Sequence, residues 1–150
     1  MTKFEQLQAA ILALSRARHW EAAKGEWSLL AIWHTDEGHS CLCTHYPIKE
    51  LCELIHEATQ QRVIVGNCCV KKFMGLPSEK IFDALKRVGK DARQAVNEEA
   101  IAHFMRVGVL SEWEGTFYRN TWRKTKLSDK QQIHRQRINA KVIAASKRKH

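Results

Sequence analysis

The stretch Cys41-Leu42-Cys43-Thr44-His45 constrains the fold more than any other part of this sequence. It places two thiols and an imidazole within five residues, and a further sulfur pair, Cys68-Cys69, follows after a predicted hairpin. Structural zinc sites use four Cys or His ligands in a tetrahedron. A sulfur pair in one loop, with a third sulfur returned by a hairpin, therefore predicts a fold stabilised by a metal ion.

The predicted zinc site takes three ligands from the first motif and one from the second: Cys41, Cys43, His45 and Cys69. Cys69 is preferred as the fourth ligand because it falls in the first turn of a predicted helix, where the helix dipole favours a thiolate. Cys68 is the alternative to Cys69, and His39 is the alternative to His45. Zinc in such a site is structural, since it stabilises a sheet too short to fold alone.

Two other interpretations of the cysteine cluster remain open. The chain has five cysteines, and in a reducing cytoplasm these are expected to stay free, which favours metal binding over disulfides. Reduced buried thiols without metal, or redox chemistry, would also account for the cluster. Cys52 has apolar neighbours and is predicted to fill the core, as free cysteines commonly do.

Length and composition are typical of one compact domain with an appendage. The chain has 150 residues, of which 44% are hydrophobic and 27% charged. It contains no apolar run long enough for a membrane span, and residues 1–6 lack the pattern of a signal peptide. We therefore expect a cytoplasmic protein.

Hydrophobic spacing and turn residues predict an α+β fold. In this fold a small zinc-stapled β-hairpin or sheet, over about residues 27–66, is surrounded by helices and followed by a basic C-terminal helix. Helix caps and breakers set the expected boundaries. Helices are predicted over residues 3–24, 68–73, 78–88, 92–106 and 128–146, with strands over 27–33, 49–57 and 62–65.

The two cysteine motifs also resemble a known class of proteins. Cys41-Leu42-Cys43-Thr44-His45, followed by Val65-Gly66-Asn67-Cys68-Cys69-Val70-Lys71-Lys72-Phe73, is similar to small zinc-knuckle, treble-clef-like proteins common in phages and mobile elements. The resemblance covers residues 41–73. It implies a binding scaffold, often for nucleic acid, and no particular reaction.

The positive charge of the chain is concentrated near its end. The formal net charge is +9, yet residues 119–150 hold eleven Lys and Arg against Asp129 alone, and residues 1–118 sum to −1. The sequence therefore predicts a compact zinc-binding α+β body over residues 1–118 and a basic helical segment over residues 119–150.

The basic segment is the candidate nucleic-acid interface. Cations attract phosphate in a salt-dependent way, and aromatic rings stack on bases. Several of its cations fall on one face of the predicted last helix. The predicted contact residues are Arg119, Trp122, Arg123, Lys124, Lys126, Lys130, His134, Arg137, Lys141 and Arg148.

Three functions compete. The leading hypothesis is a zinc-stabilised DNA- or RNA-binding accessory protein of phage or plasmid type, which grips the phosphate backbone. The alternative is a regulator that docks on an acidic surface of a polymerase, nuclease or other nucleic-acid enzyme. A metal-dependent nuclease is disfavoured, because the eight His are scattered and no acidic cluster suggests a two-metal site.

Overall fold

The computed structural model describes residues 1–147, in which helices combine with a three-stranded antiparallel sheet. This architecture confirms the predicted α+β fold class. The chain divides into two compact units, Met1–Ser78 and a second unit that begins at Glu79. None of the helices formed by residues 1–147 has the length and apolar character needed to cross a membrane.

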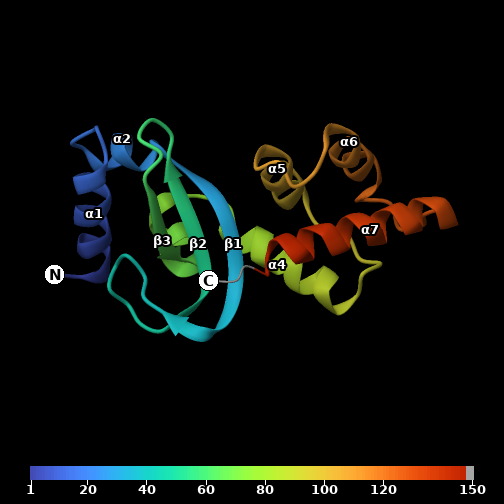
Figure 1. The fold of residues 1–150 in the computed structure, drawn as a ribbon, viewed down its shortest axis with the longest axis horizontal. Coiled ribbons are helices and arrows are strands. Elements are labelled where there is room, and N and C mark those ends of the chain that lie inside the picture. Colours follow the sequence, from blue (N-terminus) through green and yellow to red (C-terminus); the bar gives the residue numbers. More distant parts are fainter. Residues whose placement is uncertain (148–150) are drawn as a thin grey trace. The chain divides into compact units, whose positions relative to one another are not determined.

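The first unit contains the sheet (Figure 1). All five cysteines also belong to this unit. Its strands lie in the order β1-β2-β3, each antiparallel to its neighbour. Leu54 lies opposite Leu29 on one side and Val63 on the other, so three buried side chains share a face. The elements are α1 (Lys3–Leu14), α2 (Trp20–Lys24), β1 (Trp27–His39), β2 (Ile48–His56), β3 (Arg62–Gly66), α3 (Asn67–Cys69) and the π-helical turn η1 (Val70–Met74).

The helix predicted over residues 3–24 is divided into α1 and α2. The Glu26 carboxylate accepts the backbone N–H groups of Arg16 and Ala17, each at 2.8 Å. These donors would bond to backbone carbonyls in a continuous helix. The same carboxylate binds Nε2 of buried His56 at 2.6 Å, so Glu26 ties the end of α1 to β2.

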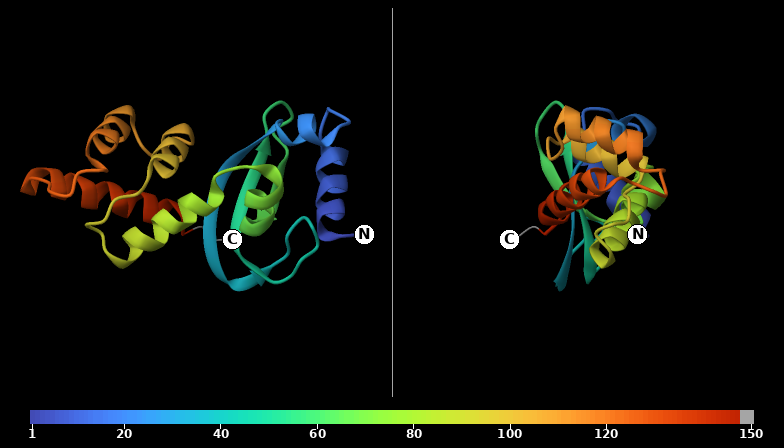
Figure 2. Two further views of the ribbon diagram at one scale, coloured as in Figure 1. Left: turned by 180° about the vertical axis from the view of Figure 1, so that it is seen from behind. Right: turned by 90° about the vertical axis from the view of Figure 1, so that its right-hand side faces the viewer.

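The segment after β3 carries Cys69 and is held by Asn67. A helix is predicted over residues 68–73, and the structure starts α3 one residue earlier, at Asn67. Its side-chain amide donates to Glu50, and its carbonyl oxygen accepts from the Ser78 hydroxyl at 2.5 Å. The chain then forms η1 and leaves it at Gly75, whose φ of +69° favours glycine. Figure 2 shows this helical turn on one face of the sheet.

The second unit is helical and is organised around a buried tyrosine. The Tyr118 hydroxyl accepts the Val96 N–H at 2.9 Å and donates to Asn139 at 2.6 Å. The Asn139 amide in turn donates to the carbonyls of Ala92 and Gln94, both at 2.8 Å. The helices are α4 (Ser78–Lys90), which starts at the end of the first unit, α5 (Glu98–Arg106), α6 (Glu112–Thr121) and α7 (Asp129–Ala145).

The basic segment differs from the predicted appendage because α7 forms part of the core of the second unit. Ile138 and Val142 of α7 are 2% and 0% exposed, and buried Arg135 donates to the Thr121 carbonyl at 2.6 Å. The helix α7 therefore belongs to the second unit, which begins at Glu79, whereas the sequence predicted a boundary between residues 118 and 119.

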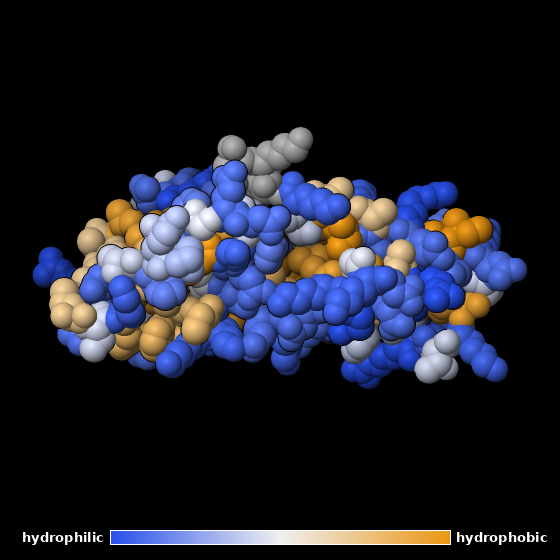
Figure 3. All heavy atoms as spheres, turned by 90° about the horizontal axis from the view of Figure 1, so that it is seen from below, coloured by the Kyte–Doolittle hydropathy of each residue, from blue (hydrophilic) through white to orange (hydrophobic). Residues whose placement is uncertain are grey.

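The two units differ in net charge. Residues 1–78 contain eight Lys and Arg and eight Asp and Glu, so the first unit is formally neutral. The second unit accounts for the whole net charge of +9. Hydrophilic residues cover most of the face that Figure 3 presents, with smaller hydrophobic areas between them.

Candidate metal centre

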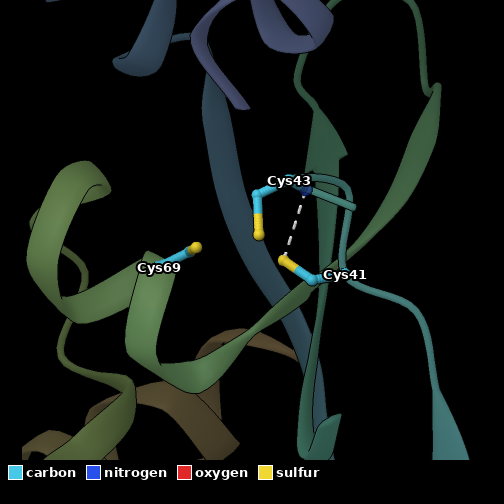
Figure 4. A group of neighbouring side chains, drawn as sticks. All are labelled: Cys41, Cys43 and Cys69. Atoms are coloured by element: carbon cyan, nitrogen blue, oxygen red, sulfur yellow. Dashed lines mark hydrogen bonds between the residues drawn. The ribbon is translucent and has the colours of Figure 1, made fainter. Parts of the chain in front are cut away.

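Three thiols converge in the first unit. Cys41 and Cys43 lie in the loop between β1 and β2, and Cys69 lies in α3, directly after β3. Their sulfur atoms lie within 4.8 Å of one another and point into a common space (Figure 4). A Zn–S bond of about 2.3 Å puts the sulfurs of a tetrahedral site about 3.8 Å apart. A small inward movement would therefore bring all three onto one ion.

The loop that carries Cys41 and Cys43 is fixed by its own backbone. The Cys41 N–H donates to the His45 carbonyl, and the Thr44 N–H donates to the Cys41 carbonyl, both at 2.9 Å. Thr44 has a φ of +78°, in the left-handed region that a branched side chain disfavours. Its hydroxyl accepts from Lys3 and donates to Gln6, so α1 holds the loop in this conformation.

Hydrogen bonds to sulfur prepare Cys41 as a thiolate. The Cys69 thiol beside it is the largest influence that lowers the pKa of Cys41, to about 5, although burial acts in the opposite direction. The N–H groups of Gly66 and Cys43, at 3.2 and 3.5 Å from the Cys41 sulfur, lower it further. The pKa of Cys69 is raised, because its thiol donates to Cys41 and because it is buried.

The three buried sulfurs are chemically suited to bind a metal ion. Cys41, Cys43 and Cys69 are 5%, 1% and 8% exposed. A buried thiolate without a compensating charge is unfavourable. A soft divalent metal would compensate all three sulfurs, and thiolate is the ligand type that selects zinc over harder cations.

The structure brings together three of the four predicted ligands and leaves His45 outside the group. His45 is exposed, but it lines the same pocket, which has a volume of about 570 Å³. Cys68 also lines this pocket and is exposed. The alternate His39 is exposed, and its Nδ1 contacts the Ser40 carbonyl at 3.1 Å. Of the predicted ligands and their alternates outside the converging group, His45 and Cys68 therefore line the pocket.

Cys52 differs from the other buried cysteines, as the sequence predicts. It is 0% exposed and lies outside the converging group. Burial raises its pKa to about 12, against a smaller opposite effect of the Ser78 hydroxyl. Cys52 is therefore a neutral core residue.

The predicted nucleic-acid residues differ in their surroundings. Arg119 and Lys141 form ion pairs with Glu98 and Glu114, at 2.9 and 2.8 Å. Trp122 is half-buried, with the Arg123 guanidinium 4.8 Å from its ring centroid. Arg148 lies outside the described residues. The exposed cations include the ion-paired Arg119 and Lys141 and also Arg123, Lys124, Lys126, Lys130 and Arg137. Half-buried His134 packs against aromatic rings of α6.

Sequence reasoning missed one residue of this region. Trp113 is 58% exposed, although its spacing with Phe117 is that of a core-facing helix stripe. No signal in the sequence shows that a tryptophan at this spacing is exposed and not buried.

No protein-family model, curated protein or solved structure matches this chain. Among residues 1–147, the three cysteines are the one group of three or more Cys, His, Asp or Glu side chains whose ligand atoms converge. The function is therefore inferred from the chemistry of the site itself.

Proposed function

We propose that this chain is a zinc-stabilised nucleic-acid-binding protein, an accessory factor of phage or plasmid type. The observation that carries the proposal is the convergence of the Cys41, Cys43 and Cys69 sulfurs within 4.8 Å. The first unit supplies the zinc site, and the second unit supplies the positive surface that contacts phosphate.

The zinc has a structural role in this proposal. It joins the β1–β2 loop to the helical turn after β3, two segments that are separated in sequence by two strands. Its fourth ligand comes from the pocket, with His45 preferred and Cys68 as the alternative. The free energy of metal binding then adds to the stability of a sheet with only three strands.

The nucleic-acid interaction follows from charge. The second unit carries the whole net charge of +9, and seven of its predicted contact cations are exposed. Lys and Arg side chains that neutralise phosphates release counterions, which gives an affinity that falls steeply with salt.

Two measurements test the proposal. Elemental analysis of the purified protein is expected to give one zinc per chain, and fluorescence anisotropy is expected to show oligonucleotide binding that weakens with added salt. A double charge reversal, Lys124→Glu with Lys130→Glu, should abolish most binding and leave the zinc content unchanged. Zinc-free protein with an intact fold would refute the zinc site.

The alternative, docking on an acidic protein surface, makes a different prediction. Partner binding would then persist after nuclease treatment, and purified oligonucleotides would bind no better to the wild type than to the charge-reversed variant.

A further inference from the structure

An aromatic platform lies between α6 and α7 in the second unit. It consists of Trp113 and Phe117, whose rings stack at 5.5 Å with an interplanar angle of 11°, and of His134. The imidazole of His134 meets the two rings edge-on, at 5.2 and 5.6 Å. Trp113 is nevertheless 58% exposed, so the indole is held in place and still offers a surface to solvent.

Positive charge flanks this platform. Lys130 and Arg137 precede and follow His134 by four and three residues, so all three share one face of α7. Both cations are exposed. The acidic Glu114 of α6 is already paired with Lys141 at 2.8 Å, which reduces its repulsion of an anion.

We infer that the platform stacks an unpaired nucleobase, so that the ligand of the second unit is single-stranded nucleic acid. This inference rests on the proposed function, because it needs the flanking cations to hold phosphate. Bases in a duplex are stacked on one another and offer no free face, whereas unpaired bases stack on exposed aromatic rings beside cationic grooves.

The ordered platform favours this ligand over a second copy of the chain. Its rings are already fixed by mutual contacts, which lowers the entropy cost of binding a flat base. A second copy would bring another unit of charge +9 against the same surface, and like charges repel.

The test uses fluorescein-labelled oligothymidylate, oligouridylate of the same length and a DNA duplex of that length, with anisotropy read at low salt. Trp113→Ala should weaken binding of a single strand by about tenfold or more, and leave duplex binding unchanged. Trp113→Phe should retain most single-strand affinity, because the aromatic face remains. The two single strands distinguish DNA from RNA as the preferred ligand.

Matched controls separate stacking from general apolar contact. Ile133 of α7 is also 58% exposed, and Ile133→Ala should leave single-strand binding unchanged. Trp113→Leu keeps an apolar side chain without an aromatic face, and should behave like Trp113→Ala. Circular dichroism and thermal unfolding check that each variant is folded.

Each outcome has a distinct meaning. If the wild type binds none of the oligonucleotides, the proposed function fails and the inference fails with it. If the wild type binds all of them and Trp113→Ala binds the single strands equally well, only the inference is overturned. A Trp113→Ala protein that sediments as a smaller species, with unchanged single-strand binding, would make the platform a contact between copies and overturn the inference.

Discussion

Cys41 and Cys52 show how strongly the surroundings of a thiol determine its chemistry. Two backbone N–H groups and the Cys69 thiol point at the Cys41 sulfur, and its pKa falls to about 5. Burial dominates at Cys52, and its pKa rises to about 12. At neutral pH the first is prepared to bind a cation and the second is not.

Cys43→Ser should therefore remove the metal, whereas Cys52→Ser should retain it. The serine hydroxyl is a poorer zinc ligand than a thiolate, and the loss destabilises residues 41–73. Each kcal/mol lost lowers the Tm of a small domain by about 4–8 °C. Zinc analysis and thermal unfolding of the two variants measure the effect, and zinc loss from Cys52→Ser would contradict the ligand set.

His103 makes the stability of the second unit depend on pH. It is 4% exposed, and burial, with a smaller effect of the Arg106 charge, lowers its pKa to about 4 from the usual 6.5. Between these values the unfolded chain binds a proton that the folded chain does not. Stability is therefore present above pH 6.5 and falls as the pH drops to 4, by on the order of 3 kcal/mol.

Urea unfolding at a series of pH values across this window measures the slope. In His103→Leu the part of the slope due to this residue should vanish. An unchanged slope in that variant would show that His103 does not cause it.

At the scale of elements, the sequence predicts a helix start correctly where the start depends on residues close together in the chain. The helix predicted over residues 128–146 begins where expected, because the Ser128 hydroxyl accepts the Gln131 N–H at 3.2 Å as part of a capping box. The predicted start of α5 was wrong by six residues, because contacts with Tyr118 and Asn139 hold residues 92–96 outside the helix. Such contacts join residues more than twenty positions apart.

Ser128→Ala should destabilise the second unit by about 1 kcal/mol, because it removes the acceptor for the Gln131 N–H at the start of α7. Ser128→Asn retains a cap and should stay close to wild type. Urea unfolding of the three proteins gives the difference, and equal stabilities would show that α7 does not depend on its cap.

The candidate site was likewise predictable only where it depends on spacing along the chain. Cysteine spacing was enough to predict that Cys41, Cys43 and one of Cys68 and Cys69 come together, because a hairpin returns the chain to its start. The preference for Cys69 rested on its place in a helical turn, and its sulfur is the one that converges with the other two. The direction of the His45 side chain depends on the Thr44 backbone and on α1, which the spacing does not encode. The exposure of Trp113 likewise follows from helix packing and not from its periodicity.

At the scale of the whole molecule, the candidate metal site and the positive charge belong to different compact units. The zinc-knuckle resemblance of residues 41–73 concerns the first unit alone and stays a prediction. In the proposed function, mutations in the first unit should therefore change metal content, and mutations in the second unit should change nucleic-acid affinity.

Truncation after Tyr118 should unfold the second unit and leave metal binding in the first. It removes buried Ile138, Asn139 and Val142, each part of the helical core. Loss of a single large core side chain costs about 2–5 kcal/mol, so the loss of a whole helix exceeds the usual stability of a domain, about 5–15 kcal/mol. Circular dichroism measures the loss of helix in the second unit, and zinc analysis measures metal binding in the first. Full retention of the helices α4 to α6 would contradict the prediction that the second unit unfolds.

The neighbouring residues Cys68 and Cys69 differ in access to solvent, because a helix rotates by about 100° per residue. Cys69 is 8% exposed, whereas Cys68 is the exposed member of the five cysteines. A maleimide dye should therefore attach at Cys68 alone, without any engineered cysteine. If added zinc protects Cys68 from the dye, Cys68 is the fourth ligand. If Cys68 is labelled equally well with zinc present, His45 takes that position, and the attached dye becomes an optical reporter beside the metal.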